Sequence, residues 1–150
     1  SRRKMMKTSA ARIEDLDFLD LQPEQLLAFP DMQAQVTAQI EQSWHAITIR
    51  DDEEVFAIVG IVLLTETHGD AWAVVAKDLK NRGFMLTKGV RYLLNWAEKH
   101  ASLIRIGILV LPTCRRHLVW AKRLGFDIEG TARKIGPNGE DYLLMSRIST

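Results

Sequence analysis

Within residues 103–126 the hydrophobic pattern changes from the continuous apolar run of a buried strand to the spacing of an amphipathic helix. The rest of the chain is predicted to pair with this strand or to cover it. Residues 104–111 form an apolar, β-branched run, which is typical of a strand covered on both faces in the middle of a sheet. A basic amphipathic helix follows, with Thr113 in position to cap its first turn. Gly125 suits the left-handed residue just past the helix, and Phe126 supplies the apolar contact that often accompanies it.

The first half of the chain is predicted to contain a short strand, two helices and a three-stranded meander. Residues 5–10 form the strand, and residues 11–21 place apolar side chains at near-helical spacing. Asp31 caps a second helix over residues 32–43. Residues 45–50, 55–64 and 71–75 then predict antiparallel strands, with turns at 51–54 and 68–70.

In the second half, residues 84–100 have the apolar stripe of a long helix that packs on the sheet. Residues 126–133 and 141–147 form the last two strands, joined by the turn sequence Gly-Pro-Asn-Gly at 136–139. The helical crossover between strands 71–75 and 104–111 favours parallel pairing of these two strands. The predicted fold class is therefore mixed α/β (α+β).

Composition narrows the class of protein. A chain of 150 residues with 47% hydrophobic residues is expected to form a single domain over residues 1–150, preceded by a solvated basic tail at residues 1–4. A net charge of +1 gives no indication of a nucleic-acid partner. No apolar run approaches the ~20 residues of a membrane span. The single Cys114 excludes an intrachain disulfide and indicates a reducing compartment, the cytoplasm.

Residues 122–126 read Lys-Arg-Leu-Gly-Phe, and the strand that follows carries Gly130. With the order of elements, this motif resembles the GNAT fold of N-acetyltransferases over nearly the whole chain. The resemblance implies a mixed central sheet of about seven strands flanked by about four helices. It also implies that acetyl-CoA lies where the strands before and after the long helix splay apart, with its pyrophosphate on N–H groups at the helix start.

The resemblance assigns cofactor binding to the end of the strand before the long helix, to the start of that helix and to the start of the last helix. The implied residues are Val74, Val75, Lys77, Asn81, Arg82, Gly83, Phe84 and Cys114.

Two positions depart from the GNAT pattern. The family's pyrophosphate loop reads Gln/Arg-x-x-Gly-x-Gly/Ala, whereas here Arg82-Gly83 is followed by the larger residues 85–87. Glycine is needed where a backbone approaches a phosphate closely. Many members carry a tyrosine, the general acid to the leaving thiolate, four residues before the Gly of Leu-Gly-Phe, and this position is Ala121. No catalytic residue is therefore assigned.

A phage subgroup of the same fold is a closer match: the GNAT-like internal virion (core) proteins of short-tailed phages. Their helix reads Asn-x-x-His-Ile-Arg-Trp-Leu-x-x-Leu-Gly. Here Cys114 replaces the Asn, whereas His117 and Trp120 stay in register, and Trp72 matches the Trp that begins the family's central strand.

Two functions stay open. One is an acyl-CoA-dependent N-acetyltransferase that acts on an amine in the host cytoplasm. The other is a non-enzymatic phage protein that keeps the scaffold and contacts virion or host proteins.

Several reactive side chains have both a chemical and a structural interpretation. Cys114 at a helix start beside basic residues has the setting of an activated thiol, but a small buried residue is favoured there. His117 either bonds a backbone carbonyl or lines the cleft. Glu66 and Asp70 are candidate bases for the amine or simply solvated. Tyr142 is a displaced acid or, more often for such a residue, a cross-strand packing partner.

The histidines and tryptophans indicate neither a metal site nor a nucleic-acid site. The four histidines lack the spacing of metal ligands, so no metal site is expected. Trp44, Trp72, Trp96 and Trp120 fall on different predicted elements, which favours core packing over a platform for stacking bases.

Overall fold

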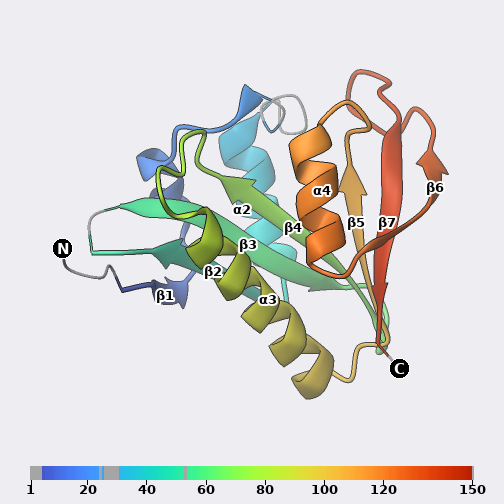
Figure 1. The fold of residues 1–150 in the computed structure, drawn as a ribbon, viewed down its shortest axis with the longest axis horizontal. Coiled ribbons are helices and arrows are strands. Elements are labelled where there is room, and N and C mark those ends of the chain that lie inside the picture. Colours follow the sequence, from blue (N-terminus) through green and yellow to red (C-terminus); the bar gives the residue numbers. More distant parts are fainter. Residues whose placement is uncertain (1–4, 24, 26–30, 53, 150) are drawn as a thin grey trace.

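The computed structural model describes residues 5–23, 25, 31–52 and 54–149 (Figure 1). The basic tail expected at residues 1–4 lies outside the described residues.

One seven-stranded mixed sheet forms the centre of the molecule, in the order β1-β2-β3-β4-β5-β7-β6. Its strands are β1 (Lys7–Ala10), β2 (His45–Arg50), β3 (Val55–Leu63), β4 (His68–Val75), β5 (Arg105–Val110), β6 (Asp127–Ala132) and β7 (Tyr142–Ile148). Neighbours pair antiparallel except β4 and β5, which are parallel. The predicted meander and parallel crossover are both confirmed.

Helices cover the sheet unequally (Figure 1). The long helix α3 (Gly83–His100) and α4 (Arg115–Arg123) pack on one face, and α2 (Met32–Gln42) packs on the other with the 3-10 helix η1 (Ile13–Phe18). Asp31 caps α2 as predicted, since its carboxylate accepts from the Ala34 N–H. The expected mixed α/β architecture is confirmed.

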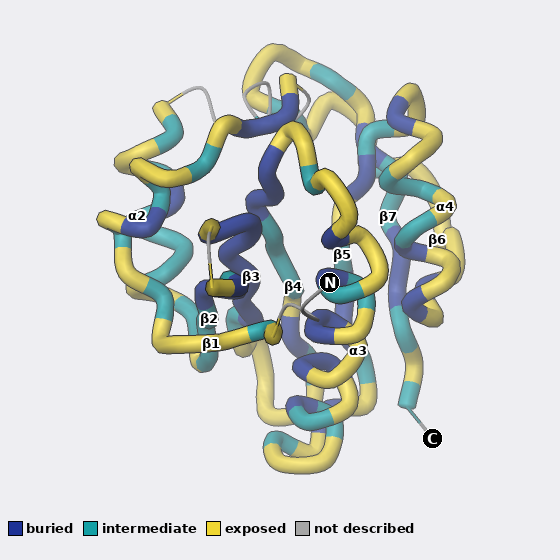
Figure 2. Tube along the Cα trace, turned by 60° about the vertical axis from the view of Figure 1, so that its left-hand side comes forward, coloured by how far each residue is buried: buried dark blue, intermediate teal, exposed yellow. Residues whose placement is uncertain are grey.

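The hydrophobic core is centred on β3, which is buried from Val55 to Ile61 because helices cover both of its faces. Figure 2 shows this strand dark and the edge strand β1 exposed. The side chains of Val59 and Ile61 join the core under α3 and α4, whereas that of Ile58 joins the core under α2. The two cores explain the continuous apolar run of residues 55–64.

The helix predicted over residues 11–21 is wrong in type and length, because only Ile13–Phe18 is helical and it is a 3-10 helix. Asp15 lies between the apolar positions of this segment, yet its carboxylate is buried. It accepts a hydrogen bond of 2.6 Å from the Thr48 hydroxyl of β2. This long-range contact holds the segment in a tighter turn than its apolar spacing predicts.

The turn predicted at residues 68–70 is wrong, because β4 already begins at His68. The chain reverses at residues 64–67, where the N–H groups of Leu64 and Thr65 both donate to the His68 carbonyl. The predicted cap of α4 is also wrong: Cys114 occupies the cap position instead of Thr113, and its side chain makes no capping bond. Gly125, however, has the expected left-handed conformation, with φ +93°.

Strand β5 lies in the interior of the sheet as predicted, between β4 and β7, but it is not covered on both faces. Ile106 and Val110 are buried under the helices, whereas Leu109 on the opposite face is 46% exposed. The helix α2 does not extend over this half of the sheet, so one face of β5 is open to solvent.

Candidate functional site

Strands β4 and β5 diverge soon after they begin. They pair over three residues only, His68 to Asp70 with Arg105 to Gly107, although β4 continues to Val75 and β5 to Val110. Beyond Asp70 and Gly107 the two strands no longer pair, and we call the space between their unpaired ends the gap; α3 follows β4 in the chain and α4 follows β5. This is the splay that the sequence resemblance implied.

The start of α3 offers backbone donors beside this gap. The first N–H groups of a helix have no partner within the helix, and no side chain of the described residues caps them here. A Cβ built on Gly83 would meet nothing within 4 Å, so the space around this turn is open. Phe84 is 82% exposed. Open N–H groups at the positive end of an 18-residue helix suit an anion.

Arg82, the residue before α3, does not extend toward this space. Its side chain is 3% exposed, and its Nε lies 2.6 Å from a carboxylate oxygen of Asp51, which is fully buried. The guanidinium also lies over the Phe56 ring, 5.8 Å from its centroid. The ion pair therefore anchors the start of α3 to the turn after β2. No local pattern indicates this partner, because Asp51 is one of four consecutive acidic residues in a predicted turn.

The other residues of the predicted loop lie at the surface. Lys77, Asn81 and Phe84 are exposed, and the Lys77 N–H donates to the Asp20 carbonyl. Lys80, which was not predicted to take part, contacts Glu54, and its ammonium lowers the pKa of that carboxyl below the ordinary 4.5.

The larger residues that replace the family's small ones have places in the fold. Met85 and Leu86 pack into the core under α3. The Thr87 hydroxyl donates to the Gly83 carbonyl at 3.0 Å and accepts from the Trp120 indole N–H at 2.8 Å. Trp120 therefore joins α4 to the first turn of α3, a role that its helical position did not reveal.

Val74 and Val75 end β4 with buried side chains, so only their backbone faces the gap. The Val75 N–H donates to the side-chain oxygen of Gln25 at 2.8 Å, and the Gln25 amide donates to the Ala73 carbonyl at 3.1 Å. Gln22 bonds the next carbonyl, that of Ala76, at 3.4 Å. Sequence reasoning missed both glutamines, because nothing in their local pattern indicates a partner about fifty residues away.

On the α4 side of the gap, His117 lies with its Nε2 2.7 Å from the Gln22 side-chain oxygen. This partner is a side chain, so both roles predicted for His117, a bond to a backbone carbonyl and a place in the lining of the cleft, stay predictions. Cys114 is buried at 5% exposure, which agrees with the structural interpretation of this residue. Ala121 is buried at 3% exposure and offers no proton donor where a general acid is expected.

Asp70 lies at the last paired position before the strands diverge. Its Oδ1 is 3.3 Å from Nε2 of His68, and a Cβ built on Gly107 would lie 2.7 Å from the same oxygen. The missing side chain at Gly107 thus makes room for the carboxylate, on the sheet face opposite α3 and α4. Glu66, the other candidate base, is exposed in the turn before β4.

Near Asp70, Arg105 of β5 binds both carboxylate oxygens of Glu129 of β6. The guanidinium lowers the pKa of Glu129 below its ordinary value of 4.5. Tyr142 lies apart from this group, under the connection between β6 and β7, where its ring would meet a Cβ on Gly136 at 2.9 Å. Burial raises the pKa of Tyr142, and its position agrees with a packing role.

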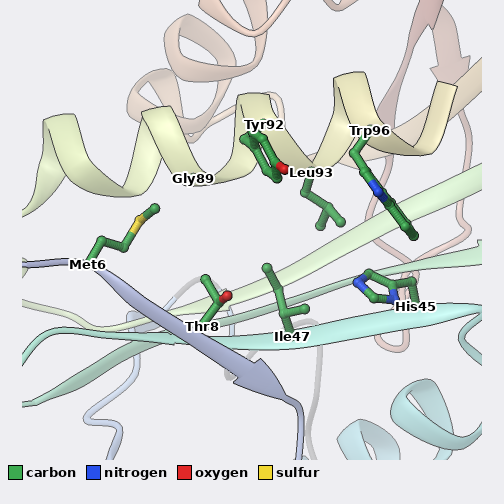
Figure 3. Close-up of a pocket in the computed structure, with 8 residues that line it drawn as sticks. All are labelled: Met6, Thr8, His45, Ile47, Gly89, Tyr92, Leu93 and Trp96. Atoms are coloured by element: carbon green, nitrogen blue, oxygen red, sulfur yellow. The ribbon is translucent and has the colours of Figure 1, made fainter. Parts of the chain in front are cut away.

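A second hollow, of about 180 Å³, lies between α3 and strands β1 and β2 (Figure 3). Its lining residues are Met6, Thr8, His45, Ile47, Gly89, Tyr92, Leu93 and Trp96. Trp96 stacks on Trp44 at 5.2 Å between ring centroids and on His100 at 4.8 Å. These rings pack on one another, as the packing interpretation predicts, and they lie toward the β1 and β2 edge of the sheet, away from β4 and β5.

Within the described ranges, no group of His, Cys, Asp and Glu is arranged to hold a metal ion. The same part of the chain contains no helix that is both long and apolar enough to span a membrane.

Comparison with solved structures identifies the fold. The spermidine N-acetyltransferase of Vibrio cholerae, in complex with CoA and spermine, matches with TM-score 0.73, 14% identity and 95% of each chain covered. The ribosomal-protein-S5-alanine acetyltransferase of Vibrio fischeri matches with TM-score 0.71 and 15% identity, over 98% of this chain and 97% of that one. A GNAT-family acetyltransferase of Bacillus anthracis matches with TM-score 0.74 and 12% identity, over 95% and 94%.

The chain therefore has the GNAT fold of acyl-CoA-dependent N-acetyltransferases. No protein-family model and no curated protein sequence matches it.

Proposed function

We propose that the protein binds acyl-CoA in the gap between β4 and β5 and transfers the acyl group to an amine. The observation that carries the proposal is the divergence of these strands beside the uncapped start of α3. The pyrophosphate of CoA is an anion, and N–H groups at a helix start bind anions without any side chain. A solved protein of this fold carries CoA and spermine together, which supports a donor and an amine acceptor here.

In this proposal, the backbone of residues 74–77 and 81–84 binds the cofactor. Cys114, at the start of α4, contacts it from the other side of the gap. Arg82 supports the site through its buried pair with Asp51 and contributes its backbone. The side chains of Lys77 and Asn81 are exposed and within the same loop, so they add polar contacts at the mouth of the gap.

The acceptor is proposed to approach over the open sheet face, where Asp70 receives the proton of the amine. A neutral amine then attacks the thioester carbonyl, and the tetrahedral intermediate expels the CoA thiolate. The amine nitrogen, which became positively charged on attack, gives up its second proton to water as the amide forms. The thiolate leaves without a protein acid, because Ala121 has no proton to give, and it takes a proton from water. A thiol has a pKa of about 8.5, so its anion is a tolerable leaving group. Transfer is expected to be slower than with a positioned acid, which typically contributes about 10²–10⁴-fold.

Isothermal titration with CoA and with acetyl-CoA tests the binding step. Saturable binding in the micromolar to millimolar range is expected, whereas no heat at millimolar ligand would remove the proposal.

The transfer step is tested with acetyl-CoA and a polyamine by following thiol release. Asp70→Asn is expected to lower the rate at neutral pH by about 10²-fold while leaving the affinity for CoA unchanged. Glu41→Gln, which removes an exposed carboxylate on α2, is the control. Equal rates for Asp70→Asn and the unchanged protein would exclude Asp70 as the base.

A second candidate function is a non-enzymatic phage protein, in the virion interior or bound to a host protein, that keeps this scaffold. It is favoured by the buried Ala121 at the acid position and by the match of His117 and Trp120 to the phage helix motif. Acetylation of a generic amine above the background rate would exclude this candidate. The genes adjoining its coding sequence are a further test, since phage structural genes there would favour it.

A further inference from the structure

Residues 20–22 and Gln25, which precede α2 in the chain, contact the edge of β4 that faces away from β3. Leu21 pairs with Ala76 as an isolated antiparallel bridge, and the Lys77 N–H donates to the Asp20 carbonyl. Leu21 and Gln22 are 8% and 7% exposed. Leu21 and Gln22 therefore cover the end of β4.

Gln25 satisfies the backbone groups of β4 that no strand reaches. Val75 and Ala73 direct their N–H and C=O groups away from β3, since Ala76 is the residue that bonds Phe56 of β3. In a parallel ladder, one residue of the partner strand accepts from one backbone N–H and donates to the carbonyl two residues earlier. The Gln25 carboxamide does both, to Val75 at 2.8 Å and to Ala73 at 3.1 Å.

A second glutamine extends this arrangement across the gap. The Gln22 amide donates to the Ala76 carbonyl at 3.4 Å, and its oxygen lies 2.7 Å from Nε2 of His117 on α4. One side chain thus connects the end of β4 to the helix on the far side of the gap. Two carboxamides occupy the place where a chain with amide groups would lie if it paired with β4.

We infer that Gln25 is an internal competitor of the ligand: its carboxamide holds the edge of β4 from Ala73 to Val75 until an amide-bearing chain displaces it. The identity of that chain rests on the proposed function, since the pantetheine arm of acyl-CoA carries two amides. The edge of β4 offers one donor, the Val75 N–H, and one acceptor, the Ala73 carbonyl. A secondary amide in a ligand has one C=O and one N–H, so it can make the same two hydrogen bonds as the Gln25 carboxamide.

Two variants separate the hydrogen bonds of Gln25 from its bulk. Gln25→Ala removes both, whereas Gln25→Met keeps the length of the side chain and removes only the amide. Gln33→Ala, at an exposed position of α2, is the matched control. The Val75 N–H is expected to exchange with solvent faster in both Gln25 variants, as measured by NMR-detected hydrogen exchange, and to be unchanged in the control.

Binding is then measured by titration with CoA and with pantetheine, which lacks the phosphates. Two hydrogen bonds at about 0.5–1.5 kcal/mol each predict that Gln25→Ala binds both ligands about tenfold more tightly than the unchanged protein. Bound ligand is expected to restore slow exchange of the Val75 N–H.

The outcomes distinguish this inference from the proposed function. Unchanged exchange of the Val75 N–H in both Gln25 variants would overturn the inference, as would equal affinity of all proteins for CoA, which leaves the proposed function intact. No binding to any of the proteins would overturn both. Tighter binding of pantetheine by Gln25→Ala without any acyl transfer would support the inference and remove the enzymatic function.

Discussion

At the start of α3, the side chains of Arg82 and Asp51 form an ion pair that is 3% and 0% exposed. Removing one partner of a buried pair typically costs about 3–5 kcal/mol, and here Glu54, 3.8 Å from the Arg82 guanidinium, offsets part of that cost. We expect Asp51→Ala to lower the free energy of unfolding by about 3 kcal/mol in urea titrations. The control is Asp52→Ala, which removes a partner of Lys7 whose side chain is 56% exposed and should change stability far less. Similar losses for the two variants would contradict the structural role of the pair.

The partner of Arg82 could not be predicted from the sequence. The sequence places Arg82 beside Gly83 at a helix start, and the GNAT resemblance then implies a phosphate contact for it. Asp51 lies 31 residues away, and a carboxylate in an acidic turn is usually solvated. Burial of this particular carboxylate depends on how the turn after β2 meets the start of α3, and no local pattern contains that contact.

Among the elements, the end of α4 was predictable because its signal is local. Gly125 has φ +93°, a conformation that is unfavourable for a residue with a Cβ by about 1–2 kcal/mol. Gly125→Ala should lower the free energy of unfolding by that amount, measured by chemical denaturation. Gly130→Ala, where an added Cβ would meet nothing within 4 Å, is the control and should be nearly neutral. The prediction fails if the two substitutions are equally tolerated.

The start of the same helix was not predictable, because Thr113 and Cys114 lie one residue apart and the choice between them depends on the end of β5. The Cys114 N–H donates to the Leu111 carbonyl, so the chain completes a turn before α4 begins. Thr113 is thereby left outside the cap position that its side chain would suit.

The pairing of Arg105 on β5 with Glu129 on β6 gives stability a defined pH dependence. The bond from Arg105 lowers the pKa of Glu129 below 4.5 in the folded state. A carboxyl with a lowered folded pKa contributes stability above its unfolded pKa and loses it as pH falls through the folded value. The free energy of unfolding should therefore fall below about pH 4.5, and less steeply in Glu129→Gln. Titration of unfolding between about pH 3 and 6 measures this, with Glu41→Gln as control.

At the scale of the whole molecule, the order of elements predicted the meander, the crossover and the final hairpin, but not which strand of that hairpin pairs with β5. The sequence 136–139 shows only that β6 and β7 are neighbours. In the structure β7 lies between β5 and β6, with Met145 fully buried opposite Ile108. The gap between β4 and β5 was implied by the resemblance alone. The residue at which two strands stop pairing depends on the tertiary packing of the elements around them, and no local pattern contains that information.

This arrangement predicts an uneven distribution of stability across the sheet. Strand β3 is buried on both faces, whereas β1 and β6 form the two edges and their residues are almost all exposed. Local opening is easiest where few buried contacts hold an element, so amides of β1 and β6 should exchange through small openings, and those of β3 only through global unfolding. Native-state hydrogen exchange at increasing urea measures the difference: opening free energies of the edge strands should be well below that of β3. If β6 were as protected as β3, its outer edge would have to be covered by another chain, and the assignment of β6 as a free edge would be wrong.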